Sequence, residues 1–144
     1  MDRPDEPGDD SFEVLKLLMT CPTVPRAGQP CFLVIARDIA DADRAGQLRS
    51  AHLDGHLAHV EANWRRYLNA GPIREPGETR LIGSTFLIFA DSESEARAVM
   101  DGDPYFTCGL YERVEVFEQT LAIGLYLGGK IWDTAEAIRG RAAG

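Results

Sequence analysis

The chain has 144 residues and a formal net charge of −8, from 15 Lys and Arg against 23 Asp and Glu. This length fits one domain with a sizeable core, and the acidic balance without a basic run argues against nucleic acid and anionic membrane surfaces as partners. No apolar stretch approaches the ~18 residues that a membrane-spanning helix needs. The acidic, Pro-rich start MDRPDEPGDD does not resemble a signal peptide, so we expect a cytoplasmic protein.

Residues 1–30 are expected to form an N-terminal extension. The first ten are acidic and rich in Pro and Gly, which favours disorder, and the apolar spacing over 12–19 predicts a short helix. Four Pro and Gly residues in 21–30 indicate a linker. The three cysteines, Cys21, Cys31 and Cys108, form no metal motif, and an odd count suits a reducing compartment.

The run CFLVIA at 31–36 is continuously apolar, which predicts a central strand covered on both faces and ended by Arg37-Asp38. After a polar turn at 41–46, we expect one amphipathic helix that begins near Arg49 and leads into a short strand at 67–70, with a stop at Gly71-Pro72. Its buried stripe would comprise Leu53, Leu57, Val60 and Trp64.

All three histidines, His52, His56 and His59, would lie along one edge of that helix, beside the apolar stripe. Such an edge can line a pocket between helix and sheet. Alternatively, imidazole rings often sit at a core boundary without a functional role. Gly55 in the same helix either allows a close approach or simply faces solvent.

The second half of the chain also predicts a strand, a helix and a further strand. Residues 80–90 predict the strongest strand, with a break at Gly83-Ser84, and 92–100 predict a helix capped by Asp91 or Ser92. Residues 113–117 alternate like a half-exposed strand. The order strand, helix, strand, strand, helix, strand predicts an α+β, ferredoxin-like split βαβ domain over 31–119.

A sheet with helices on one face leaves the other face bare, so we expect a second copy to pack against it as a homodimer. The C-terminal extension, 120–144, has an apolar stretch at 121–132 and a short helix at 134–141. We expect this extension to contact the partner.

The sequence resembles the YciI-like (YCII-related) family of small dimeric α+β barrel proteins over roughly 31–117. The matching pieces, in order, are a strand ending in Asp38, Arg49-Ser-Ala-His52 or His56-Leu57-Ala58-His59, Ala70-Gly71-Pro72, Gly83-Ser84, Glu95-Ala96, Asp103-Pro104-Tyr105 and Gly109-Leu110-Tyr111-Glu112. Each piece is weak alone, but their order and spacing are specific. The extensions at both ends depart from the family's compact form.

The resemblance implies a pocket where a helix histidine pairs with Asp103 as an active-site dyad. The Arg-x-Ala-His pattern points to His52, whereas the distance back from Ala70-Gly71-Pro72 points to His56, which we favour. One family member dechlorinates a chlorinated hydroxyquinone, which implies a cofactor-independent lyase, isomerase or dehalogenase acting on a small cyclic substrate. A binding or accessory module without catalysis, using the same pocket for a small ligand, is the alternative.

The remaining candidates would bind substrate: Arg49 and Ser84 could hold an anionic oxygen, with Asp38 and Tyr105 beside them. Asp38 could instead cap the next turn, and Asp103 could be only a cap ahead of Pro104. A zinc site at His52 and His56, completed by His59 or Asp103, is a further alternative, although we expect no metal and no cofactor.

Overall fold

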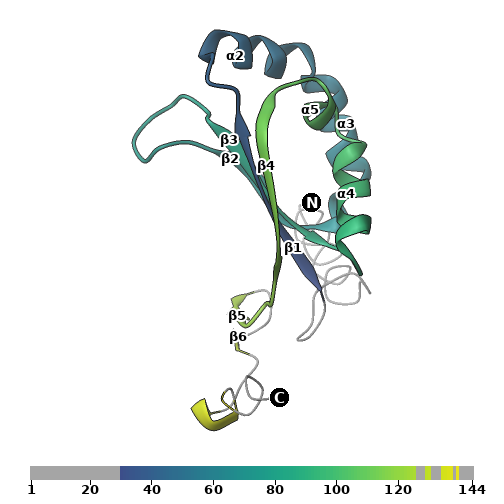
Figure 1. Cartoon of the computed structure of the whole chain (residues 1–144), viewed down its shortest axis with the longest axis vertical. Coiled ribbons are helices and arrows are strands. Elements are labelled where there is room, and N and C mark those ends of the chain that lie inside the picture. The colour runs from purple at the N-terminus through teal and green to yellow at the C-terminus, as the bar shows by residue number, and fades with distance from the viewer. Residues whose placement is uncertain (1–29, 126–128, 131–133, 138, 140–144) are drawn as a thin grey trace, which may run out of the picture.

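The computed structural model describes residues 30–125, 129–130, 134–137 and 139 (Figure 1). The expected N-terminal helix and linker lie outside these residues. The strands are β1 (Cys31–Asp38), β2 (Tyr67–Ile73), β3 (Gly83–Phe89), β4 (Tyr111–Gln119), β5 (Ile123–Gly124) and β6 (Gly129–Lys130). The helices are α2 (Ala42–Ala51), α3 (Leu53–Ala62), the 3₁₀ turn η1 (Trp64–Arg66), α4 (Glu93–Asp101) and α5 (Pro104–Thr107).

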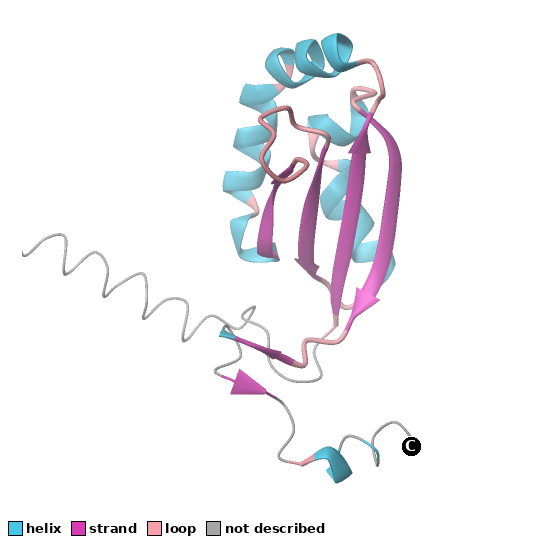
Figure 2. Ribbon diagram, turned by 90° about the vertical axis from the view of Figure 1, so that its left-hand side faces the viewer, coloured by secondary structure: helices cyan, strands magenta, loops and turns pink. Residues whose placement is uncertain are grey.

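The main sheet has four antiparallel strands in the order β2-β3-β1-β4, and the helices cover one of its faces (Figures 1 and 2). This confirms the ferredoxin-like prediction, with β1 in the centre. None of the helices described is long and apolar enough to cross a membrane. β5 and β6 form a separate two-stranded pair beyond the end of β4.

The core lies between the sheet and α4. Phe32, Val34 and Ala36 point from β1 toward the helices and pack with Phe86 and Met100. Leu33 and Ile35 alternate with them and are only half-buried on the other face. Period-two alternation therefore holds for β1, although its sequence is apolar throughout.

The apolar side chains of that other face form a row across three strands. Leu33 lies opposite Leu87 on one side and opposite Phe117 on the other, and Phe117 is 49% exposed. This open face is where the sequence predicts a second copy.

Helix α4 begins where the sequence indicates. The Ser92 hydroxyl accepts a hydrogen bond from the Glu95 backbone N–H at 3.1 Å, and a Glu95 carboxylate oxygen accepts one from the Asp91 N–H. The first bond satisfies the Glu95 N–H, which the first helical turn leaves without a partner, and the second ties the residue before the cap to the start of the helix.

The single helix expected after Asp41 is wrong: there are two, and they meet at His52. Residues 42–46, expected as a turn, belong to α2, which Asp41 caps by accepting from the Arg44 N–H. Buried Ala45 and Leu48 hold α2 across the end of the sheet, whereas α3 descends along its side (Figure 1). The chain must therefore change direction between α2 and α3. The spacing of apolar residues along the sequence does not predict such a bend.

Strand β2 also differs from its expected length, because it continues through Gly71-Pro72 to Ile73. Pro72 is tolerated there because β2 is an edge strand, where a missing N–H can face solvent.

Candidate functional site

His56 and Asp103 form the centre of the candidate site. The imidazole Nδ1 lies 2.9 and 3.0 Å from the two carboxylate oxygens of Asp103, whose side chain is fully buried. Because a carboxylate only accepts, Nδ1 is the donor, and Nε2 is left as the acceptor nitrogen of the neutral ring. Nε2 makes no hydrogen bond with any residue in the described part of the chain.

Asp103 is also the N-cap of α5, as the sequence allowed for a residue ahead of Pro104. Its Oδ1 accepts a hydrogen bond from the Tyr105 backbone N–H at 3.0 Å. This bond helps to fix the orientation of the carboxylate that His56 contacts. Gly55 lies against Pro104, where a Cβ atom would come within 3.0 Å of the proline ring. The glycine thus brings α3 close enough to α5 for the pair to form.

Tyr105 stacks on the His56 ring. The ring centroids are 3.9 Å apart and the planes differ by 6°. The Tyr105 hydroxyl donates a hydrogen bond to the Arg49 carbonyl at 2.9 Å. The Tyr105 ring is therefore held both by its stacking on His56 and by this hydrogen bond. Burial raises the pKa of Tyr105, while the Arg49 charge opposes the effect in part.

Arg49 lies at the junction of α2 with the sheet. Its Nε and Nη2 donate to both carboxylate oxygens of Asp38 at 3.0 and 2.9 Å, and Nη2 also donates to the Gly83 carbonyl. Burial alone would lower the pKa of Arg49, but the hydrogen bonds and charge of Asp38 raise it above its ordinary value. The Asp38 carboxylate therefore pairs with the Arg49 guanidinium instead of capping the next turn.

Ser84 is buried on β3 beside the Gly83 carbonyl. Nearby, the Tyr111 hydroxyl is buried and has no hydrogen-bond partner among the described residues. Burial raises the pKa of Tyr111, with smaller opposing effects from Ser84 and Arg49. Tyr111 was not among the expected site residues, although it belongs to the Gly-Leu-Tyr-Glu motif.

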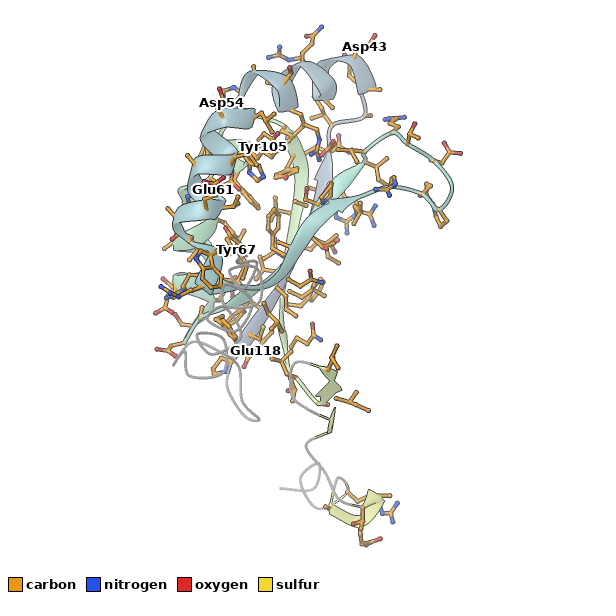
Figure 3. All side chains as sticks on the ribbon, turned by 180° about the vertical axis from the view of Figure 1, so that it is seen from behind. Asp43, Asp54, Glu61, Tyr67, Tyr105 and Glu118 are labelled. Carbon is orange, nitrogen blue, oxygen red and sulfur yellow. The ribbon has the colours of Figure 1, made fainter. Side chains whose placement is uncertain are left out.

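A cavity of about 690 Å³ opens between α3 and the β2–β3 edge of the sheet. Its polar lining includes four of the expected site residues, Arg49, His56, Ser84 and Tyr105. Figure 3 shows the labelled Tyr105 between α3 and the strands. Its apolar lining includes Leu53, Leu57, Val60, Trp64, Ala70, Pro72, Leu81 and Phe86.

The stripe expected to be the buried face of the helix has a different role. Leu53, Leu57 and Trp64 are 43–44% exposed, and no residue of α3 is fully buried. The apolar period of the sequence thus marks the wall of an open cavity, because α3 stands away from the sheet instead of packing on it. A pocket wall and a core face have the same sequence pattern.

His52 and His59 do not join His56. His52 lies at the junction of α2 and α3, where its side chain makes no capping hydrogen bond, and it is not part of the cavity lining. His59 faces Gly102, where a Cβ atom would lie 2.8 Å from its ring. In the part of the chain that the structure describes, no three His, Cys, Asp or Glu side chains are grouped as a metal would require. The zinc arrangement considered above is therefore not formed by these residues.

Comparisons with known proteins agree with this architecture. Protein YciI from Escherichia coli O6:H1 and Protein YciI from Shigella flexneri are each 36% identical over 92 residues, which cover 59% of this chain and 91% of theirs. The 5-chloro-2-hydroxyhydroquinone dehydrochlorinase from Burkholderia phenoliruptrix, solved with 2,5-dihydroxybenzoquinone, shares the fold. It matches with a TM-score of 0.56 and 23% identity over 67% of this chain and 97% of its own.

A solved Bacteroides fragilis protein, described as dimeric and ferredoxin-like, gives a TM-score of 0.43 at 12% identity, covering 65% of this chain and 97% of its own. The YCII-related domain model matches residues 31–120, from the first residue of β1 to just beyond β4. This chain belongs to the YCII-related family.

Proposed function

We propose that the protein is a cofactor-independent lyase, isomerase or dehalogenase that moves protons on a small hydroxylated ring through His56 and Asp103. The observation that carries the proposal is the contact of His56 Nδ1 with both oxygens of the buried Asp103 carboxylate. A carboxylate in this position fixes the tautomer and orientation of the imidazole. His56 also lines the cavity, so a ring bound there would meet a base.

His56 is the general base of the proposed reaction, with Nε2 as the accepting atom. In loss of HCl from the keto tautomer of a chlorinated hydroxyhydroquinone, Nε2 takes the proton of a ring hydroxyl. The O–H electron pair forms the C=O bond, the ring double bond shifts, and chloride leaves with the C–Cl pair. The dehydrochlorinase that shares this fold is named for such a compound, which makes it a suitable first substrate.

The other polar residues assist in this proposal. Ser84 can donate to a ring oxygen, and Arg49 supplies positive charge at the same end of the cavity. Asp38 and Tyr105 are positioning residues, because one fixes the Arg49 guanidinium and the other stacks on the His56 ring.

Chloride release from 5-chloro-2-hydroxyhydroquinone in D₂O, together with deuterium at the dechlorinated carbon of the 2-hydroxy-1,4-benzoquinone product, tests the proposal. Asp103→Asn keeps an acceptor for the Tyr105 N–H but presents an amide to His56, which favours the wrong tautomer. We expect kcat to fall about 10²- to 10⁴-fold in Asp103→Asn and His56→Gln, with ligand affinity changed only a few-fold.

His52→Gln is the matched control, because His52 is next to α3 but outside the cavity lining. It should keep wild-type rates. Binding of the ring without turnover or deuteration in the wild type would favour the non-catalytic binding module. Equal losses in His52→Gln and His56→Gln would contradict the assignment of the base.

The homodimer is also part of the proposal. The row of Leu33, Leu87 and Phe117 on the open sheet face supports a second copy packed sheet against sheet. Sedimentation at micromolar concentration should give a dimer mass, and Phe117→Glu should shift it toward the monomer. A wild-type monomer would contradict this part of the proposal.

A further inference from the structure

The cavity has a polar cluster at one end and mainly apolar side chains along the rest of its length, with Glu61 and Asn69 among them. His56, Arg49 and Ser84 lie at one end, where Arg49 donates to the carbonyl next to Ser84 and His56 stacks on Tyr105. From His56 to Trp64 the chain advances eight residues, or about 12 Å at the helical rise. From Ser84 to Ile88, strand β3 advances about 13 Å in the same direction.

The two walls therefore run side by side away from the dyad. Pro72 pairs with Ser84, Ala70 with Phe86, and Tyr67 with Ile88. The labelled Tyr105 and Tyr67 mark the two ends in Figure 3. Between them, the helix contributes Leu57 and Val60.

The volume exceeds what a single small ring requires. At about 30 Å³ for each water-sized group, 690 Å³ holds about 23 such groups, whereas a six-membered ring with four oxygens has about ten non-hydrogen atoms. The remaining space lies along exposed apolar side chains, Leu57 and Trp64, that no described residue covers. Glu61 also lines this part and would repel a carboxylate, so the occupant carries no negative charge there.

We propose that the ligand of this cavity is amphipathic, with a hydroxylated ring at His56 and an uncharged apolar arm that extends along α3 to Trp64. The inference rests on the proposed function for the placement of the ring, and it adds the substrate class. An alkyl-substituted phenol or hydroxyquinone has this chemistry. Leu57 and Trp64 are then the specificity residues, since they contact the arm and not the reacting atoms.

Calorimetric titration with 2,5-dihydroxybenzoquinone and its 3-butyl and 3-hexyl derivatives tests the inference. A fully buried methylene raises affinity about fourfold, and half-exposed walls should give about twofold each. The hexyl compound should therefore bind about 60-fold more tightly than the parent ring.

Leu57→Asn should reduce this ratio at least threefold. Leu125→Asn is the matched control, because Leu125 is 93% exposed and is not part of the cavity lining. It should leave the ratio unchanged. Trp64→Ala provides a second variant at the far end, and it should affect the hexyl compound more than the butyl compound.

A ratio near one in the wild type, an equal change in Leu57→Asn and Leu125→Asn, or no binding of any of the three compounds at millimolar concentration would overturn the inference. If the ratio is near one while turnover depends on His56, the inference fails and the proposed function stands. If the ratio holds but His56→Gln leaves turnover unchanged, the proposed function fails and the amphipathic ligand stands.

Discussion

Removing the guanidinium of Arg49 should destabilise the fold strongly, because it would leave the Asp38 carboxylate buried without its partner. The Arg49 side chain is 14% exposed and that of Asp38 only 3%, and two hydrogen bonds join them. Loss of one member of a buried ion pair costs about 3–5 kcal/mol. Because the pair borders the cavity, we expect the lower end for Arg49→Met, about 3 kcal/mol.

Asp38→Asn should lower the free energy of unfolding by less, about 1–2 kcal/mol. In this variant Arg49 keeps its hydrogen bond to the Gly83 carbonyl, and its side chain is still partly exposed to water. The double variant should be more stable than the sum of the single effects predicts, with a coupling free energy of about 1.5–3 kcal/mol. Arg49→Lys keeps the charge but loses the planar fork, so its cost should lie between zero and that of Arg49→Met.

Urea unfolding followed by circular dichroism gives these free energies, and thermal unfolding provides a check. A loss of 3 kcal/mol corresponds to a decrease in Tm of about 10 °C for a chain of this size. Additive single effects would refute the coupling between Arg49 and Asp38. A cost below about 1 kcal/mol for Arg49→Met would show that this pair behaves like an exposed one.

Other predictions concern the sheet, a helix cap and a thiol. Gly83→Ala should cost about 1–3 kcal/mol in urea unfolding, because its Cβ would fall on the Ala36 carbonyl, whereas Gly71→Ala, with open space around it, should be within ~0.5 kcal/mol of wild type. Ser92→Ala should lower the free energy of unfolding by about 1 kcal/mol, and a neutral result would contradict the cap. Burial raises the pKa of Cys31 from 9.0 to about 11, so the native thiol should resist iodoacetamide at pH 8. The unfolded thiol ionises first as pH rises; the free energy of unfolding should therefore fall between about pH 9 and 11, and by less in Cys31→Ala.

The order of elements was predictable from the sequence, because alternation and helical spacing are local properties. CFLVIA predicted a central strand, and it lies between β3 and β4. The sequence predicted a helix capped by Asp91 or Ser92, and Ser92 is the residue that caps α4. Six such segments in this order are compatible with few topologies, so the ferredoxin-like fold followed.

The site depended on tertiary packing. Spacing alone left His52 and His56 equivalent, since they are four residues apart, and only the bend between α2 and α3 separates them. That bend arises because buried Leu48 holds α2 across the end of the sheet, which a helical period in the sequence does not encode. The pairing of Arg49 with Asp38 likewise requires the end of β1 to meet α2. Leu57 and Trp64 have the spacing of residues on a core-facing side of a helix. Whether that side faces a core or a cavity depends on the distance between the helix and the sheet. Packing elsewhere in the molecule sets this distance.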